Sequence, residues 1–359
     1  MGGGMSAVAL ARREPAVLLP ATAPRPFGSE RLLVISPLAA RVSDRSIAAL
    51  PELFEAGDVL VVNDAATLPA SLRVADHDAE LRLLGRAGER QFFVVALGAG
   101  DHHTATERRG EPPSFELGAR LDLGGLSAEI VAVLGRRRYR IRFDVGGAEL
   151  IQALYRAGSV IQYAHVAPEL ELWDVQNRFA SRPWAVEMPS AGRPLSWDAI
   201  TALRRRGAEV VGLTHAAGLS SSGLAELDRL LPLPEASEIP VETVRAIERA
   251  RAGGHRVVAV GTSVVRALED SARERGGLRA GKRDARLVIG PGFRARVVSA
   301  LLTGLHEPGT SHFALMRAFA AESLLCRALE LAAARGYLQH EFGDACLIDG
   351  GGAGRVGLG

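Results

Sequence analysis

Polar side chains that can move protons or bind ligands follow four apolar segments of this 359-residue sequence. They are Asn63, His215, the run 261–263 and His306. Imidazole has an unperturbed pKa of ~6.5, so His215 and His306 are candidates for a general acid and a general base near neutral pH. If the four segments are parallel strands, their carboxyl ends share one sheet edge, where α/β proteins bind ligands. We therefore expect these residues to line one crevice.

The strongest local signal is the turn formed by Gly261, Thr262 and Ser263, which follows the apolar run 257–260. A glycine lets the backbone turn closely, and the free N–H groups of a helix that starts here would favour a carboxylate or a phosphate. The alternative is that Thr262 or Ser263 only caps the helix, and the pattern leaves both readings open. A single glycine is not the G-x-G-x-x-G pattern, so we do not expect a dinucleotide-binding Rossmann enzyme.

The hydrophobic periodicity changes along the chain. Residues 28–72 and 146–359 alternate apolar runs with helical patterns, which predicts an α/β domain: a mostly parallel sheet with helices on its faces. Residues 73–145 have a period of two and are punctuated by Gly and Pro, which predicts an inserted small antiparallel β-barrel domain. We interpret residues 1–27 as a flexible N-terminal arm.

Caps and periodicity also predict individual elements of the α/β domain. Ser196 is the expected N-cap, and Gly207 the expected C′ residue, of a helix that ends near residue 206. The other expected helices span residues 241–252, 264–275 and 313–335, and further strands are expected at 209–215, 287–289 and 297–302.

The net charge does not indicate a nucleic-acid or membrane partner. The 43 Lys and Arg residues nearly balance the 41 Asp and Glu residues, which gives a net charge of +2. The arginine run 136–138 lies on a predicted hairpin and could contact RNA phosphates. The run 204–206 is more simply a solvated helix end, where basic side chains interact favourably with the helix dipole.

Composition also argues against several classes of protein. No apolar run is long enough to span a membrane, and we expect a cytoplasmic protein that is a monomer. Cys326 and Cys346 lie in no CxxC or Cys/His cluster, which argues against a disulfide scaffold. His102 and His103 have no third ligand at a suitable spacing, so we expect no metal.

Several segments resemble the S-adenosylmethionine:tRNA ribosyltransferase-isomerases of queuosine biosynthesis. Residues 254–269, GHRVVAVGTSVVRALE, resemble that family's G-x-R-V-x-A-V-G-T-T-x-x-R-x-L-E segment. Residues 301–311, LLTGLHEPGTS, resemble its L-x-T-N-F-H-L-P-x-S-T segment. Shorter similarities occur, in family order, at residues 57–70, 189–192, 291–293 and 342–345.

The resemblance implies an α/β domain that carries an inserted antiparallel barrel. It also implies transfer of the ribosyl moiety of S-adenosylmethionine to a 7-aminomethyl-7-deazaguanine in tRNA, with rearrangement to epoxyqueuosine and release of adenine and methionine. S-adenosylmethionine is then the co-substrate, tRNA the partner, and no other cofactor is implied.

The matched segments imply site roles for particular residues. His306 and His215 would be base and acid candidates, with Glu235 as a second base candidate. The residues assigned to substrate binding are Gly261, Thr262, Ser263, Arg266, Asn63, Ser190, Gly192 and Thr310.

The sequence departs from the family pattern at several polar positions. Ala66 and Ser71 replace two family arginines, Pro194-Leu195 replaces a His-Phe pair, and Gly304 replaces an asparagine. Two alternatives therefore stay open: a catalytically impaired paralog that binds nucleotide or RNA, and a related transferase with another acceptor.

Overall fold

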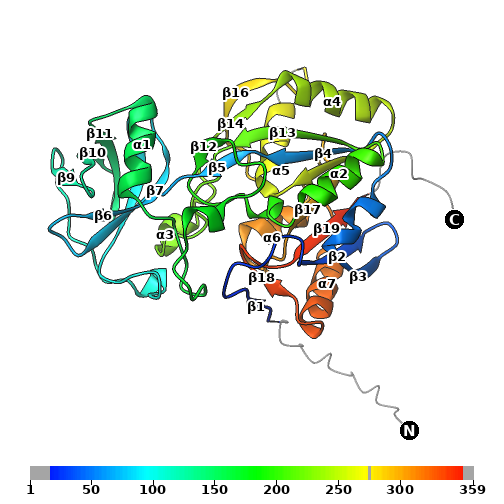
Figure 1. Ribbon diagram of the computed structural model, residues 1–359, viewed down its shortest axis with the longest axis horizontal. Coiled ribbons are helices and arrows are strands. Elements are labelled where there is room, and N and C mark those ends of the chain that lie inside the picture. Colours follow the sequence, from blue (N-terminus) through cyan, green and yellow to red (C-terminus); the bar gives the residue numbers. More distant parts are fainter. Residues whose placement is uncertain (1–16, 274–275, 351–359) are drawn as a thin grey trace, which may run out of the picture.

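The larger of the two lobes in Figure 1 is built around a long mixed sheet. The computed structural model of the protein describes residues 17–273 and 276–350. Within this part of the chain the large sheet has nine strands. In spatial order they are β16 (Gly281–Ala285), β14 (Glu235–Ile239), β13 (Glu209–His215), β4 (Val59–Asn63), β15 (Val257–Val260), β17 (Ala300–Gly304), β19 (Ala345–Asp349), β2 (Arg31–Ser36) and β3 (Arg41–Ser46).

The parallel part of this sheet is its centre, where β13, β4, β15 and β17 are neighbours. The prediction of a mostly parallel sheet needs correction, because four of the eight strand pairings are antiparallel. The β2–β3 connection shows why: it is a short turn over residues 37–40, and such a connection can join only antiparallel strands.

Helices cover both faces of the sheet, as predicted. Alternate residues of each strand point to opposite faces, so Val59 and Val61 pack on one side while Leu60 and Val62 pack on the other. The first side carries α4 (Val241–Ala252), α5 (Thr262–Ala272), α6 (Ser311–Met316) and α7 (Glu322–Ala334). The second carries α2 (Trp197–Arg205) and the 3-10 helix Ile47–Leu53.

The capping predictions for α2 are confirmed. Ser196 Oγ accepts a hydrogen bond from Ala199 N at 3.1 Å, and Gly207 has a φ of 84° just after the helix. The helix predicted over 313–335 is two helices instead, α6 and α7, separated by residues 317–321. This break contains neither Gly nor Pro, so the sequence carries no signal for it.

Two predicted strands also differ from the structure. Residues 287–289 form no strand, because Leu287 N donates to Asp270 Oδ1 and Leu287 O accepts from Arg266 Nε. The strand expected from residue 297 begins only at Ala300, since the amides of residues 297 and 298 bind the Glu269 carboxylate. The strand at this edge of the sheet is the polar strand β16, which the sequence analysis did not predict.

The smaller lobe is the predicted inserted β-module, an antiparallel six-stranded sheet that is nearly closed into a barrel (Figure 1). Ala75 N donates to Asp122 O at 2.8 Å and so links the first and last strands. The strands are β6 (Ser71–Val74), β7 (Ala79–Arg86), β8 (Gln91–Leu97), β11 (Arg138–Phe143), β10 (Ser127–Val133) and β9 (Arg120–Asp122).

Helix α1 (Gly147–Ala157) packs on the small lobe, because Leu150 and Leu154 are part of that lobe's core. The domain limits at residues 73 and 145 stay predictions. The hydrophobic core of the small lobe extends beyond both limits, because it includes Leu68 before residue 73 and Leu154 after residue 145.

Short elements link the lobes and the N-terminal segment. They are β5 (Ala65–Thr67) with β12 (Arg182–Ala185), α3 (Ala225–Asp228), β18 (Leu338–Gln339) and β1 (Leu19–Pro20). The flexible arm predicted for residues 1–27 is wrong for residues 17–27: Leu18 and Ala21 are buried, and β1 pairs with β18. Residues 1–16 of that predicted arm lie outside the described residues.

Candidate active site

The carboxyl edge of the four parallel strands is where the predicted site residues gather. Asn63 ends β4, His215 ends β13, Gly261 follows β15 and His306 lies two residues after β17. Since these strands are hydrogen-bonded neighbours, the prediction that their ends share one sheet edge is confirmed.

A buried charged cluster lies beside the end of β13. His215 Nε2 lies 2.8 Å from Glu235 Oε2, and the same carboxylate oxygen forms an ion pair with Arg266 Nη1. The other oxygen, Glu235 Oε1, accepts a hydrogen bond from Gly218 N at 2.6 Å. His215 is fully buried, whereas the Glu235 side chain keeps 13% of its surface accessible. Glu235 is therefore the most exposed member of this cluster.

Electrostatics keep Glu235 ionised. Burial alone would raise the pKa of Glu235, but the His215 ring and the Arg266 guanidinium outweigh it and lower this pKa below its ordinary value. Arg266 is itself held in place by the carbonyls of Leu233 and Ala285, at 2.6 and 3.0 Å. The sequence predicts a substrate-binding role for Arg266. In the structure its guanidinium instead donates to groups of the protein and orients the Glu235 carboxylate.

Asn63 ties the strand ends together. Its Oδ1 accepts hydrogen bonds from the backbone N–H groups of His215 and Ala65, at 2.9 and 3.0 Å. Its Nδ2 donates to His215 O at 2.9 Å and to Ser263 Oγ at 3.4 Å. The amide holds β13 and the helix start beside β4.

The Gly261 turn begins α5 and leaves the helix start open. Gly261 has a φ of 94°, and no side chain caps this helix end, so the capping alternative for Thr262 and Ser263 is not what the structure contains. The first N–H groups of a helix have no intrahelical partner and attract anions. A Cβ added to Gly261 would lie 3.3 Å from Ala191 Cβ. The 3-10 helix Ser190–Gly192 thus packs directly on the turn, and the substrate-binding assignments of Ser190 and Gly192 stay predictions.

His306 belongs to a group of histidines near the same edge. Its Nε2 lies 3.0 Å from Thr303 Oγ1, and its ring stacks on His312 with centroids 4.7 Å apart. Burial, helped by His312 and His340, lowers the pKa of His306 well below its ordinary value, so the ring is neutral near pH 7. Burial likewise lowers the pKa of His312, while the Glu235 carboxylate opposes this effect. His312 thus stacks on His306 and lies within electrostatic range of the Glu235 carboxylate.

Thr310 has a structural role. Its Oγ1 accepts a hydrogen bond from Phe313 N at 3.1 Å and donates to Glu307 O at 2.8 Å, so it caps α6. The structure does not bring this exposed threonine into the cluster.

Two further acid–base groups near the site were missed by the sequence analysis. Tyr163 Oη donates to the Glu187 carboxylate, which also accepts from Ser220 N at 3.0 Å. Burial raises the pKa of Glu187, and burial and the adjacent carboxylate raise the pKa of Tyr163. The only signal for Glu187 is its place just before the matched segment 189–192.

Residues with the side-chain types that bind metals also meet near the site. One ligand atom each from His165, His340 and Glu341 lies within 4.8 Å of the others, and His165 Nε2 is 3.0 Å from Glu341 Oε2. Sequence spacing could not reveal this group, because His165 lies 176 positions before Glu341 and only His340 and Glu341 are neighbours in the sequence. The expectation that no metal binds stays a prediction.

One departure from the family pattern, Ser71, lies beside a buried charged cluster in the small lobe. Ser71, which replaces a family arginine, lies opposite Arg82 in the β6–β7 register and donates to Glu80 Oε1 at 2.7 Å. Glu80 also pairs with Arg82 and Arg109, and although burial opposes them, these contacts lower its pKa to about 2. Two arginines thus occupy this region despite the serine.

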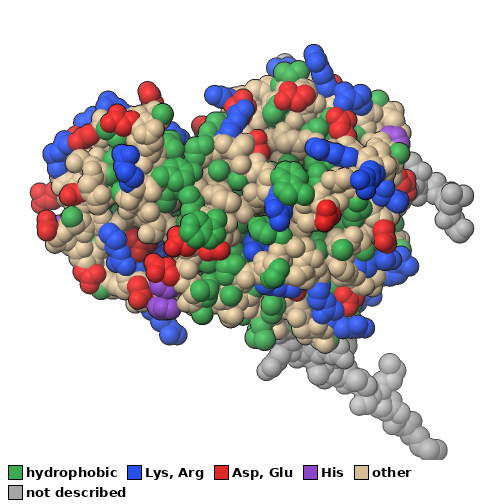
Figure 2. All heavy atoms as spheres, viewed as in Figure 1, with side chains coloured by type: hydrophobic (Ala, Val, Ile, Leu, Met, Phe, Trp, Pro, Cys, Tyr) green, Lys and Arg blue, Asp and Glu red, His purple; other side chains and the backbone are tan. Residues whose placement is uncertain are grey.

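Basic side chains do not form a single patch on the visible face. Figure 2 shows them distributed over both lobes among acidic side chains. In the predicted RNA-binding hairpin, Arg136 and Arg137 both pair with Glu111. Among the described residues, no helix has both the length and the apolar composition needed to cross a bilayer.

Fold and site together define an α/β protein with an inserted antiparallel barrel and a charged acid–base cluster at the carboxyl edge of parallel strands. A family model described as "Queuosine biosynthesis protein" matches residues 15–348. The chain belongs to this family.

Individual relatives agree with this assignment. The chain is 34% identical over 324 residues to an S-adenosylmethionine:tRNA ribosyltransferase-isomerase of Thermus thermophilus, covering 86% of this chain and 89% of the relative. It is 32% identical over 336 residues to the protein of that name from Parvibaculum lavamentivorans, covering 91% and 94%. The crystal structure of an S-adenosylmethionine tRNA ribosyltransferase from Thermotoga maritima has the same fold, with a TM-score of 0.51 at 24% identity, over 92% of this chain and 96% of that one.

Proposed function

We propose that this chain transfers the ribosyl moiety of S-adenosylmethionine to a 7-aminomethyl-7-deazaguanine in tRNA and isomerises it, which gives epoxyqueuosine. The observation that carries the proposal is the Glu235–His215–Arg266 cluster, which lies at the carboxyl edge of the parallel strands in a chain of this family. The names of the relatives supply the donor and the acceptor.

The donor binds at the open start of α5. Its methionine carboxylate or its ribose accepts hydrogen bonds from the N–H groups after Gly261 and from the hydroxyls of Thr262 and Ser263. The donor also carries a positive sulfonium. Its charge is stabilised by the nearby Glu235 carboxylate, which Arg266 and His215 hold in the ionised form.

Proton transfer starts the reaction. The sulfonium acidifies the adjacent C–H, and a general base removes that proton. His306, with its neutral ring, and Glu235, whose side chain keeps 13% of its surface accessible, are our candidates for this base. His215 acts as a positioning residue, because it is fully buried and its Nε2 is committed to Glu235.

The acceptor amine then forms the new C–N bond and loses a proton, while the electron pair left by the C–H deprotonation forms a second new bond within the rearranging ribosyl moiety. The C–N bond to adenine and the C–S bond to methionine break, and each leaving group keeps the electron pair of its bond. Burial raises the pKa of Glu187, which makes this carboxyl a stronger base and a candidate to exchange a proton with the amine or with the leaving adenine.

The proposal is tested by incubating the protein with S-adenosylmethionine and a tRNA that carries the 7-aminomethyl base, and by measuring released adenine. We expect release that depends on both the donor and the modified tRNA. No release at high enzyme concentration, although both ligands bind, would identify the chain as an impaired paralog. Release with a different acceptor alone would identify a related transferase.

A further inference from the structure

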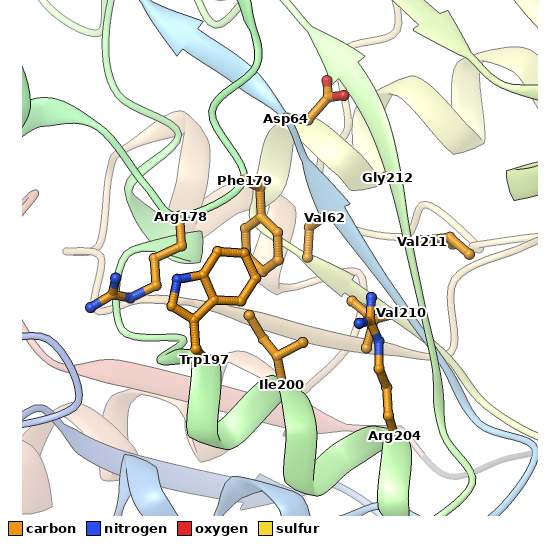
Figure 3. A pocket seen from close by; sticks show the side chains of 10 residues that line it. All are labelled: Val62, Asp64, Arg178, Phe179, Trp197, Ile200, Arg204, Val210, Val211 and Gly212. Carbon is orange, nitrogen blue, oxygen red and sulfur yellow. The ribbon is translucent and has the colours of Figure 1, made fainter.

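A small cavity lies on the α2 face of the sheet, next to the candidate active site but separate from the Glu235 cluster. It is open to solvent and has a volume of about 280 Å³. The residues that line it are Val62, Phe179, Trp197, Ile200, Val210 and Val211, together with Arg178, Arg204, Asp64 and Gly212. Figure 3 shows Trp197 and Ile200 rising from α2 toward Phe179 and Val62, with Arg178 on one side and Arg204 on the other. The cavity is thus an apolar floor between two cations.

Both cations are available to a ligand. Within residues 17–273 and 276–350, no acidic side chain forms an ion pair with Arg178 or Arg204. Arg178 Nε is buried without a hydrogen-bond partner, and its guanidinium lies over the Phe27 ring, 4.1 Å from the centroid. The one acid of the cavity, Asp64, already accepts hydrogen bonds from Thr214 Oγ1 at 2.5 Å and Ser181 Oγ at 3.1 Å.

The aromatic side chain is also free to stack. Trp197 is the first residue of α2 and lines the apolar part of the cavity. Its side chain is nevertheless 56% exposed. Proteins that bind single-stranded nucleic acid combine exposed aromatic side chains with cations that follow the backbone, so that bases stack and phosphates pair. Both parts of this arrangement are present here.

We propose that this cavity binds one nucleotide of the acceptor RNA loop, next to the base that reacts, with its base stacked on Trp197 and its phosphates paired with Arg178 and Arg204. The inference rests on the proposed function for the identity of the RNA. It adds a binding site and a chemical class of ligand, a single-stranded nucleotide.

Charge argues against the donor as the occupant. S-adenosylmethionine carries a sulfonium and an ammonium against one carboxylate, so two unpaired arginines repel it, whereas they attract a phosphodiester. Pockets for drug-sized ligands enclose roughly 300–1,000 Å³. A cavity of about 280 Å³ lies at the lower end of this range and has room for one ring system.

The cavity is connected to the active site through a few residues. Asn177, next to Arg178, donates from Nδ2 to Asn63 O at 3.3 Å and to Pro189 O at 3.2 Å. Phe179 packs against Gly192, 3.6 Å from a Cβ built there. A loop whose reacting base enters beside the Gly261 turn can therefore place a neighbouring nucleotide on Trp197.

The test measures binding of a fluorescently labelled anticodon stem-loop RNA by anisotropy, with the full-length protein. We expect Trp197→Ala to weaken binding by about 10- to 100-fold, and Trp197→Phe to retain most of the affinity, because a phenyl ring also stacks. Arg178→Ala and Arg204→Ala should each reduce the slope of log K against log salt by roughly 0.7, the value for one phosphate contact on a single strand.

Two matched controls separate this effect from general loss of aromatic surface or charge. Trp173→Ala removes a tryptophan that is 71% exposed but does not line the cavity. Arg245→Ala removes an exposed arginine of α4, on the other face of the sheet. Both should bind the RNA like the wild type, and all variants should bind S-adenosylmethionine with unchanged affinity in calorimetry.

The proposal is overturned if Trp197→Ala binds the RNA within about twofold of the Trp173→Ala control, or if it weakens the donor instead, which would make the cavity a donor site. Absence of RNA binding by the wild type also overturns it. A wild-type protein that binds the RNA through Trp197 but releases no adenine would contradict the proposed function and leave this inference standing.

Discussion

His215 Nε2 and Glu235 Oε2 lie 2.8 Å apart, although 20 positions separate the two residues in the sequence. They meet because β13 and β14 pair antiparallel at their ends, with His215 opposite Ser237. His215 is fully buried, so its contribution passes through the carboxylate that it orients. In the proposed function, this relationship makes Glu235 the reacting group and His215 and Arg266 its supporting groups.

Replacement of Glu235 tests the reacting group. We expect Glu235→Gln to lower the rate of adenine release at least about 100-fold, because the amide is neither a base nor a counter-ion for the sulfonium. It should also destabilise the protein by about 3 kcal/mol, because it leaves the buried Arg266 charge unpaired.

Urea unfolding and adenine release measure these two effects. The matched control is Glu209→Gln, which breaks the exposed pair with Arg249 and should change stability by less than ~1 kcal/mol at full activity. Equal behaviour of the two variants would contradict the assignment of Glu235.

Replacement of His215 tests the positioning role. We expect His215→Ala to lower kcat by roughly 10- to 100-fold with little change in the donor Kd, because orienting contacts around a reacting group commonly contribute that much. His215→Gln should recover part of kcat, since its amide can donate to Glu235. Steady-state kinetics and calorimetry separate the two quantities. If the glutamine variant is no more active than the alanine variant, the positioning role is contradicted.

The histidine group predicts a pH-dependent stability. The pKa of His306 in the folded protein lies well below ~6.5. As the pH falls, this histidine therefore becomes protonated at a higher pH in the unfolded chain than in the folded protein. The free energy of unfolding should therefore fall as the pH drops below ~6.5, and His306→Asn should make this fall shallower.

Glu187, whose pKa is raised, acts in the opposite sense, but it is present in both proteins and cancels in the comparison. Urea unfolding of both proteins at several pH values provides the test. Identical pH dependence for wild type and variant would show that the pKa of His306 is not depressed.

The Gly261 turn predicts a difference between two glycine substitutions. Gly261→Ala and Gly254→Ala both place a side chain at a positive φ, of 94° and 74°, and each should cost about 1 kcal/mol. Only the first would also push a methyl group against Ala191, because nothing lies within 4 Å of a Cβ at Gly254. We expect Gly261→Ala alone to weaken S-adenosylmethionine binding, by about tenfold or more, as measured by calorimetry. Equal donor affinities of the two variants would show that the Gly261 turn is not part of the donor-binding site.

The sequence predicted those parts of the site that depend on local pattern. The strand ends at Asn63, His215 and Gly261 follow from apolar runs and a glycine, and parallel pairing then brings them together. The ion pair between Glu235 and Arg266 depends on where β14 lies relative to α5, which no local pattern encodes.

Groups from loops and from polar strands were the hardest to predict. Tyr163 and Glu187 reach the site through irregular segments, and periodicity carries no information about such segments. His312 is different, because it directly follows the matched segment 301–311 and could have been considered with it. The edge strand β16, Gly-Lys-Arg-Asp-Ala, has no apolar alternation and was missed for that reason.

The central claim is that the cluster at the carboxyl edge of the parallel strands carries out ribosyl transfer to an RNA base. Mass spectrometry of the nucleosides from tRNA treated with wild-type protein and with Glu235→Gln measures this transfer directly. The account predicts that the wild type converts the 7-aminomethyl base to one carrying the epoxycyclopentane ring, with equal amounts of adenine and methionine released, and that the variant leaves the base unchanged. An unchanged base after treatment with wild-type protein and saturating donor, or full conversion by the variant, would contradict it.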